Sequence, residues 1–403
     1  MLFRKIPHSR VIIKTGELWG ILSLALKGRL VNGPYITEFE REFAKYIGTE
    51  FAVAVASGRL GLRLILQALG LEESDEIIMP AYTFHAVYET IVKCGFRPVL
   101  VDINENDCNI DTGLIEQKIS DKTRAIIATH LYGNPCDLDK ILEISRRYKL
   151  FVIEDCAQAI GAQYRNKKTG SYGDCSFFSL ESVKPFHTLG GGMITTNNAL
   201  LYEKLRRQAG KLPYPGNYAI AKKIIFTIIE AVLTQPFFFS VFVYPALLLM
   251  SFLNKDLKTI AKKTKSRFKL LESRYSNFQA YIGLRKLQDL DGALDKRIIN
   301  AKLLISGLRP GIYTWQPPAY LKPIFYYLVL RCRDAGAVAK VLLGKGIDVD
   351  LNLVQKCTAV LSEKNYPIAC MVSKATLLVP VYPELDSIEI RYISGKINKI
   401  FDK

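Results

Sequence analysis

The sequence predicts an α/β fold with a mostly parallel sheet in a large domain, followed by a smaller C-terminal α+β domain. Short apolar runs at 51–56, 76–80, 97–103 and 125–131 alternate with stretches of helical periodicity. This alternation is typical of parallel sheets with right-handed crossovers. A further apolar run ends in a carboxylate, at the strand end where α/β sheets place their ligand sites. The 403 residues are enough for two such domains.

Composition limits the partners. The formal net charge of +17 favours phosphates, nucleotides, anionic lipid or nucleic acid. The positive excess is concentrated beside one apolar segment and lacks interleaved aromatic residues, so we expect no nucleic-acid binding. Eight cysteines without CxxC pairs or His-rich spacing predict no metal site and indicate reduced packing residues of a cytoplasmic protein. Residues 1–14 lack an apolar stretch long enough for a signal peptide.

The first 70 residues predict helices, a strand and a possible anion site. Residues 16–48 are amphipathic, with a break at Gly33-Pro34, and the strand 51–56 leads through Ser57-Gly58-Arg59 into a helix at 60–69. Small residues at the start of a helix present free backbone N–H groups and the positive end of the helix dipole, which suits an anion. An ordinary N-cap serine explains the same pattern.

The central stretch is 151–196. Its first apolar run ends at Glu154-Asp155, its second spans Cys175 to Leu180, and Lys184 follows. A carboxylate at one strand end and a lysine after the next can lie on opposite sides of one crevice. That pair suits pyridoxal phosphate (PLP), whose aldehyde a lysine holds as a Schiff base while a buried carboxylate pairs with the pyridinium nitrogen. Taken singly, each residue has a simpler interpretation: Asp155 could cap a loop, and Lys184 could be a solvated surface residue.

At these residues the chain resembles the PLP-dependent nucleotide-sugar aminotransferases of the DegT/StrS type. The matching motifs are Glu154 to Gln158, Gly173-Asp174, Ser179 with Lys184 five positions later, and Gly191-Gly192. The resemblance runs from about Gly28 to the C-terminus, broken by one foreign segment. It implies the type I fold of PLP-dependent transferases, a homodimer with its sites at the subunit interface, glutamate or glutamine as amino donor, and a keto-sugar acceptor.

The resemblance also assigns roles to particular residues. It implies that Lys184 holds the cofactor aldehyde, Asp155 keeps the ring nitrogen protonated, Gln158 bonds the ring hydroxyl, Phe84 stacks on the ring, and Ser57, Gly58, Ser179 and Arg274 hold the phosphate. Two positions depart from the family pattern. Arg59 replaces a Thr and could bind the phosphate or narrow the pocket, and Glu272 replaces an Asn that reaches the partner subunit's phosphate.

The reaction follows from the lysine. Family dehydratases have His at that position, so Lys184 favours transamination, with His187 no substitute. A PLP-dependent sugar dehydratase or lyase is the alternative enzyme. A non-catalytic membrane-bound scaffold is the third reading, supported by Arg59 and Glu272. His130 could be a core residue or a substrate contact. Asn352 to Val354 stand where the family has His-Tyr-Pro, which indicates a different substrate.

The foreign segment is strongly apolar. Ala231 to Leu253 has no charged residue over 23 positions, long enough to span a bilayer. Basic residues on both flanks contradict a single crossing, and Pro236 and Pro245 would break a straight helix. We expect residues 224–254 to form two short helices that dip into the inner leaflet of the cell membrane, with lysines on anionic lipid. A helix pair at a dimer interface is the alternative. The segment also suggests a lipid-linked rather than nucleotide-linked acceptor.

The predicted division is therefore a PLP-binding domain at 1–212, a membrane-associating insert at 213–269, and a connecting helix with a small domain at 270–403. In the last part we expect one long helix from Ser276 to Asp295, then a strand at 323–332, a helix at 334–346 and a strand and helix within 375–400.

Overall fold

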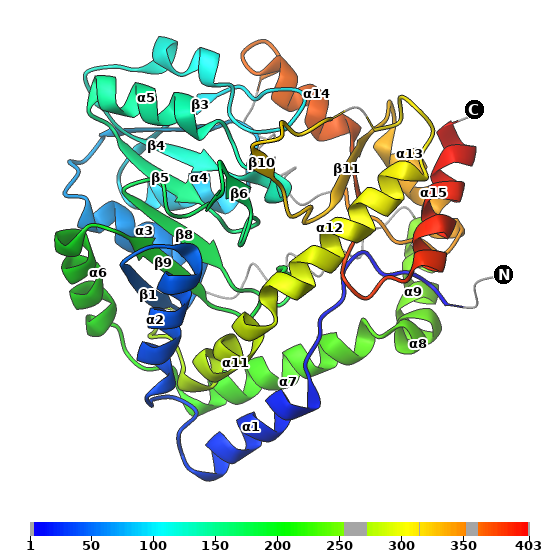
Figure 1. The fold of residues 1–403 in the computed structure, drawn as a ribbon, viewed down its shortest axis with the longest axis horizontal. Helices are drawn as coiled ribbons and strands as arrows, with labels where there is room; N and C mark the ends of the chain where they lie inside the picture. Colours follow the sequence, from blue (N-terminus) through cyan, green and yellow to red (C-terminus); the bar gives the residue numbers. More distant parts are fainter. Residues whose placement is uncertain (1–3, 254–271, 314, 352–361, 402–403) are drawn as a thin grey trace.

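The computed structural model describes residues 4–253, 272–313, 315–351 and 362–401. Its centre is a seven-stranded sheet in the order β1-β9-β8-β5-β4-β2-β3 (Figure 1). The strands are β1 (Phe51–Val55), β2 (Glu76–Pro80), β3 (Arg97–Val101), β4 (Thr123–Thr129), β5 (Phe151–Asp155), β8 (Cys175–Ser179) and β9 (Gly192–Thr196). Only β9 pairs antiparallel in this sheet, with β1 on one side and β8 on the other. The expected mostly parallel sheet is confirmed.

Helices cover both faces of the sheet. On one face, α3 (Gly58–Ala68), α4 (His85–Lys93) and α6 (Ala199–Lys211) pack on Ile127 and Ile153. On the other, α5 (Leu138–Tyr148) packs on Val152, while α2 (Tyr35–Ile47) covers the β1 end. Because successive strand residues point to opposite faces, Asp155 lies on the α3 face and Glu154 on the α5 face. The helix α1 (Thr15–Leu26) packs against α11 (Asn277–Gln288).

The C-terminal lobe is α+β, as expected. Its helices and strands are α12 (Leu290–Ser306), β11 (Leu328–Arg331), α13 (Ala335–Gly344), α14 (Pro367–Ala375), β12 (Thr376–Val379) and α15 (Ser387–Phe401). The strands β11 and β12 pair antiparallel. Ile6 forms a bridge with Ile347, and His8 Nδ1 lies 2.7 Å from Asp348 Oδ2. The first described residues therefore pack in this lobe and not in the large one. Short strands β6 (Gln163–Tyr164), β7 (Lys167–Lys168) and β10 (Leu321–Lys322) form a small third sheet.

The prediction of one helix from Ser276 to Asp295 is wrong. The chain forms α11 (Asn277–Gln288) and then α12, which starts at Leu290. The break is Asp289, whose backbone is not helical (φ −104°, ψ 4°) and whose carboxylate lies 2.5 Å from Lys14 Nζ. Asp is a poor residue for a helix interior, and here its side chain instead bonds to the N-terminal segment.

The insert forms α7 (Asn217–Leu233), α8 (Pro236–Phe238), a π-helical turn η4 (Phe239–Val243) and α9 (Tyr244–Phe252). In Figure 1, α7 crosses the lower part of the molecule above α1, and α8 and α9 lie below the C-terminal lobe. Among the described helices, none alone has the length and apolar composition to cross a bilayer. The stretches Asn217–Leu233 and Pro236–Phe252 reach the required length and apolar composition only when taken together. The two stretches are bent by 72° relative to each other. The expected break near Pro236 is thus present. The basic run 255–269 and Asn352 to Val354 lie outside the described residues.

Candidate active site

Several predicted site residues lie at the carboxyl ends of neighbouring strands. Thr129 of β4 is in register with Asp155 of β5, and Asp155 is in register with Phe177 of β8. Residues in register share a face, and so do residues two apart on one strand. The side chains of Thr129, Asp155 and Ser179 therefore lie on the α3 face. This is the edge where parallel sheets bind ligands.

Lys184 and Asp155 interact across this edge. Burial lowers the pKa of Lys184 to about 8, although the charges of Asp155 and Glu181 act in the opposite direction. Burial raises the pKa of Asp155, opposed by the backbone N–H of Ala157 (3.0 Å) and by the charge of Lys184. Each group thus shifts the pKa of the other. The amine and the acid therefore lie close enough for their charges to interact.

The first turn of α3 lies against Ser179. Ser57 caps the helix, its Oγ accepting from the N–H of Leu60 (3.2 Å), so the N-cap reading applies. A Cβ added to Gly58 would lie 3.3 Å from the Cβ of Ser179, so glycine lets the helix approach β8 closely. Arg59, half-buried, follows in the same turn. The free N–H groups of this turn and the adjacent Ser179 side chain are therefore suitably placed to bind an anion.

Gln158 and Phe84 occupy the rest of the edge. The N–H of Tyr132 donates to Oε1 of Gln158 (2.9 Å), which fixes the amide and leaves Nε2 as the end that can donate. Phe84 precedes α4 and is 47% exposed, so a face of its ring is open to a ligand.

Two buried hydroxyls support a polar ligand here. The Oγ1 atoms of Thr83 and Thr129 have no hydrogen-bond partner among the described residues, although both side chains are buried. Thr129 lies beside Asp155, and Thr83 immediately precedes Phe84. Unsatisfied buried polar atoms are uncommon in folded proteins and often mark a ligand or water position. The residues present therefore fit a cofactor with polar substituents, and the sequence had not singled out either threonine.

Arg274 is beside the anion site but its guanidinium is turned away. Its backbone bridges Val55, two residues before Ser57. Its Nε donates to the carbonyl of Leu212 (2.9 Å) and its Nη1 to the Tyr214 hydroxyl (2.9 Å). Within one subunit, Arg274 is not brought to Ser179. Glu272 lies 2.6 Å from Nη1 of Arg63, so its carboxylate is held by an arginine of α3.

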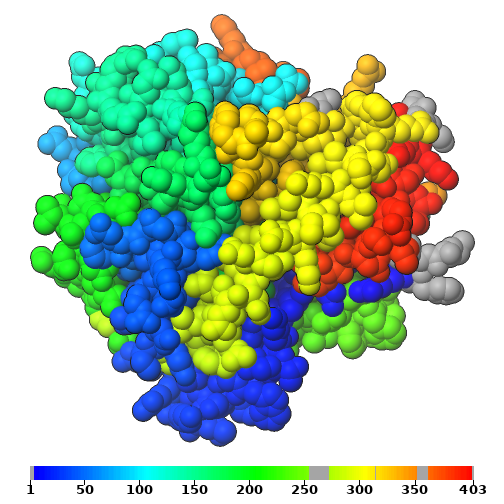
Figure 2. Space-filling model, viewed as in Figure 1, coloured from blue at the N-terminus to red at the C-terminus, as the bar shows by residue number. Residues whose placement is uncertain are grey.

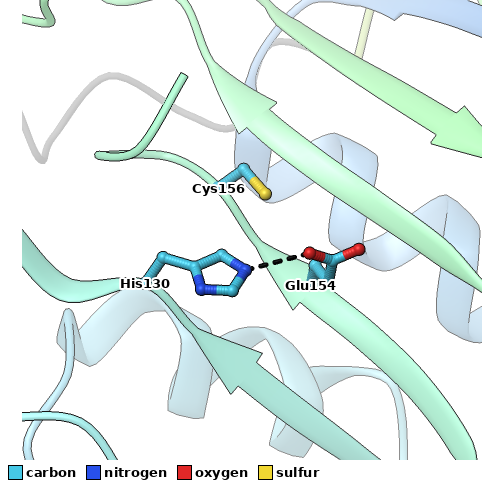
Figure 3. A group of neighbouring side chains, drawn as sticks. All are labelled: His130, Glu154 and Cys156. Atoms are coloured by element: carbon cyan, nitrogen blue, oxygen red, sulfur yellow. Dashed lines mark hydrogen bonds and ion pairs between the residues drawn. The ribbon is translucent and has the colours of Figure 1, made fainter. Parts of the chain in front are cut away.

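His130 belongs to a structural cluster on the opposite face of the sheet. Figure 3 shows its ring directed at Glu154, with Nε2 3.0 Å from Oε2, and Cys156 nearby. The Nδ1 atom accepts the N–H of Cys136 (3.2 Å), so Nε2 carries the proton. Glu154 also accepts the N–H groups of Gly170, Tyr172 and Gly173. These bonds satisfy the imidazole and carboxylate without a metal, and His130 is a core residue.

The insert contacts the loop that carries Lys184. The Oγ of Ser182 donates to Oε2 of Glu230 on α7 (2.6 Å). A Cβ at Gly190 would lie 2.7 Å from Nζ of Lys223, and burial lowers the pKa of Lys223. Of the two lysines that precede the apolar segment, Lys223 therefore points inward and is not a lipid contact.

The fold and these strand-end groups define an α/β protein of the aminotransferase class. The family described as DegT/DnrJ/EryC1/StrS aminotransferases matches residues 14–225, and the chain belongs to that family. The GDP-perosamine synthase of Caulobacter vibrioides is 46% identical over 179 residues, which are 44% of this chain and 48% of that protein. The dTDP-3-amino-3,6-dideoxy-alpha-D-galactopyranose transaminase of Aneurinibacillus thermoaerophilus is 45% identical over 179 residues, 44% and 49% of the two chains. The chain thus spans about half the length of the curated relatives it matches.

Solved structures cover nearly the whole chain. The aminotransferase of Psychrobacter cryohalolentis superposes with a TM-score of 0.78 at 23% identity, covering 98% of this chain and 99% of its own. The PLP form of a candidate sugar aminotransferase from Streptococcus pneumoniae gives a TM-score of 0.78 at 21% identity, covering 99% of both chains. These likenesses confirm the predicted type I transferase fold.

Proposed function

We propose that the protein is a PLP-dependent aminotransferase that transfers an amino group from an amino acid to a keto-sugar. The observation that carries this proposal is the electrostatic interaction of Lys184 with Asp155, the last residue of β5, at the ligand edge of the sheet. Family membership supports it, and the relatives named above are sugar transaminases or an aminosugar synthase.

Each residue at this edge of the sheet has its own proposed role toward the cofactor. Bound PLP supplies an electron sink for the substrate carbon. With PLP bound, the first turn of α3, with Ser57, Gly58 and Arg59, and the Ser179 hydroxyl would hold the phosphate. Asp155 would pair with the ring nitrogen, Gln158 would bond the ring hydroxyl, and Phe84 would pack on the ring.

Lys184 is the group that moves a proton. Its lowered pKa of about 8 leaves roughly a tenth of the amine neutral at pH 7, so the amine can take a proton from one carbon and return it to another. A lysine here, where the dehydratase branch has His, favours amino transfer over loss of water. The loop that carries Lys184 is held on one side by Tyr326 and on the other by Glu230 of the insert.

The experiment is direct. Purified protein with PLP should be yellow, lose that colour on adding an amino donor, and regain it on adding a keto-sugar nucleotide. The Lys184→Ala variant should show neither change. A colourless wild-type protein that binds no PLP would leave only the scaffold reading, and ammonia or water release without a donor would indicate a lyase.

We also propose that the enzyme is a homodimer that contacts the inner face of the cell membrane. Exposed apolar side chains gather on α1 and on the insert: Trp19 (67%), Leu26 (81%), Ile225 (56%), Phe226 (56%), Phe237 (69%), Phe242 (60%), Leu249 (61%) and Phe252 (85%). Figure 2 shows α1 along the lower edge of the molecule, with the end of the insert to its right. Such a concentration of exposed aromatic and aliphatic groups is typical of an interaction surface. A lipid-linked keto-sugar as acceptor would suit an enzyme placed there.

A further inference from the structure

The helix α7 of the insert has the opposite burial pattern from an ordinary surface helix. Its inward face carries Lys223, Thr227 and Glu230, of which Thr227 is buried and the two charged residues are half-buried. Its outward face carries large, exposed apolar side chains: Ile225, Phe226, Ile229, Val232 and Leu233. A surface helix normally turns its charged side chains to water. The inward charges of α7 therefore indicate a partner inside the molecule.

That partner is the loop that carries Lys184. The loop is closed at its base, where the N–H of Leu180 donates to the carbonyl of Gly191 (2.9 Å). The Oγ of Ser182, two residues before Lys184, donates to Oε2 of Glu230 (2.6 Å). Ser182 is only 7% exposed, so water has little access to this bond. The insert is thus bonded to the loop close to the reacting lysine.

The far end of the same loop has a strained backbone and also packs on α7. Leu189 has a φ of 59°, a left-handed conformation that is rare for a bulky side chain, and Gly190 and Gly191 follow with φ of 103° and 120°. Such a backbone persists only where its surroundings hold it. The buried Leu189 side chain belongs to one apolar cluster with Ile220 of α7 and with residues of α1 and α11. The insert therefore helps to hold the loop at both of its ends.

Lys223 acts on the loop through charge. A Cβ built on Gly190 would lie 2.7 Å from Nζ of Lys223 and 3.5 Å from Oε2 of Glu181, so the ammonium and the carboxylate approach the same point of the loop. Burial lowers the pKa of both Lys184 and Lys223; Glu181 opposes this effect at both lysines, together with Asp155 at Lys184. Glu181 is exposed, and its side chain is free to turn toward either amine. The two lysines thus share one carboxylate.

We propose that Lys223 and Glu230 of the insert are positioning residues for the reacting lysine: Glu230 seats the loop through Ser182, and Lys223 holds the Glu181 carboxylate at Gly190, away from Lys184. The proposal rests on the proposed aminotransferase function and adds the insert to the parts that set the reactivity of its lysine. Without Glu230 the loop opens to water, and without Lys223 the Glu181 carboxylate pairs with Lys184. Both changes favour the charged amine.

The first test needs neither cofactor nor turnover. Acetic anhydride acetylates only neutral amines, so its rate of reaction with Lys184 in the full-length apoprotein, followed over a pH series by peptide mass spectrometry, reports the protonation of that amine. The wild-type midpoint should lie near 8. Lys223→Met and Glu230→Ala should each raise it by roughly 0.3 to 1 pH unit, the effect of one nearby charge or of partial hydration. Lys222→Met, the same change at the next residue, whose Nζ lies over the Phe226 ring, should not move it.

Every variant keeps the other charged and titratable groups that face Lys184 or line the same cavity: Asp155 of β5, Tyr326, Arg297 of α12, Glu384, and the His187–Lys286 pair. A shift of the midpoint is therefore assigned to α7. Midpoints of Lys223→Met and Glu230→Ala that stay at the wild-type value would overturn the proposal, and so would an equal shift in Lys222→Met.

The second test separates the two routes. Glu230→Gln keeps an oxygen that accepts from Ser182 and should restore the wild-type midpoint. Glu181→Gln should lower the midpoint, and Lys223→Met should shift it less in that background than in the wild type. An equal shift in both backgrounds would reject the route through Glu181. If Lys223→Met does not fold, Glu181→Gln at its exposed position decides that route, because an unchanged or raised midpoint rejects it. Expected midpoints in an apoprotein that takes up no PLP would count against the proposed function and not against the role of α7.

Discussion

Nζ of Lys184 lies 5.1 Å from the centroid of the Tyr326 ring. Tyr326 belongs to the C-terminal lobe and positions the loop of the large domain that carries Lys184. The Tyr326 hydroxyl donates to the carbonyl of Val183, the residue before Lys184 (3.0 Å). A cation over an aromatic face is stabilised by the ring quadrupole. A movement between the two lobes would therefore shift the Lys184 amine.

Tyr326→Phe should slow turnover without abolishing it. The ring stays under the ammonium, but the bond to Val183 is lost. A typical hydrogen bond contributes about 0.5–1.5 kcal/mol, so we expect kcat to fall roughly twofold to tenfold. Steady-state kinetics measure this, with the visible spectrum checking that cofactor is retained. Tyr392→Phe, which loses a hydroxyl bond to Lys345 on the surface of α15, should leave kcat unchanged. Equal effects of both variants would refute a specific role for Tyr326.

The pH dependence of cofactor binding should follow Lys184. A lysine reacts with an aldehyde only as the neutral amine, so the rate of PLP uptake by apoprotein should rise with pH through about 8. The negative charge of Asp155 raises the pKa of Lys184, so Asp155→Asn should move the midpoint to lower pH. Stopped-flow absorbance over a pH series measures both. Asp139→Asn, at an exposed pair with Arg165, should leave the midpoint in place. A midpoint that stays near 10.5 in the wild type would contradict the enclosed position of the lysine.

The His130–Glu154 cluster should contribute to stability and not to catalysis. Burial alone would raise the pKa of Glu154, but the bonds from His130 and from the N–H groups of Gly170 and Gly173 hold it below 4.5. The ionised Glu154 carboxylate therefore stabilises the fold fully at a pH above its pKa in the unfolded chain. This stabilisation is lost as the pH falls through its lower pKa in the folded protein. Glu154→Gln leaves N–H donors facing an amide NH₂, and we expect it to cost about 1–3 kcal/mol of unfolding free energy, the cost of leaving a buried donor unsatisfied.

Denaturant unfolding at neutral pH measures that cost. Glu143→Gln, which removes an exposed ion pair with Arg147, should change the unfolding free energy by less than about 1 kcal/mol. Added zinc should not raise the midpoint of either protein. A zinc-dependent increase in the wild type that is lost in Glu154→Gln would make the cluster a metal site after all.

Local patterns were sufficient for much of the fold and failed where distant segments meet. Alternating apolar runs predicted the strands, and the Asp155 to Lys184 motifs predicted the family, because both are encoded within short stretches. The break at Asp289 depends on Lys14, far away in the sequence, and no periodicity reveals it. Tyr326 was missed for the same reason: it is unremarkable in its own segment and contacts the Lys184 loop only where the C-terminal lobe meets the large one. Thr83 alone had a local signal, since it directly precedes the expected stacking residue.

The apolar surface of the insert gives the last prediction. If it enters lipid, the protein should float with vesicles containing anionic lipid, and Phe226→Ser combined with Phe242→Ser should reduce binding at least tenfold, because each exposed Phe would lose about 1.5–3 kcal/mol of burial. Leu200→Ser, at a position on α6 that is more exposed (78%) than either Phe, should float like the wild type. Sedimentation of the same proteins separates the two roles of this surface. Variants that still float but fall apart into monomers would show that α7 to α9 join two subunits and do not contact the membrane. Variants that stay dimeric and no longer float would place the surface in lipid. Because Glu230 of α7 accepts a hydrogen bond from Ser182, the membrane-contacting insert would then also contact the loop that carries Lys184.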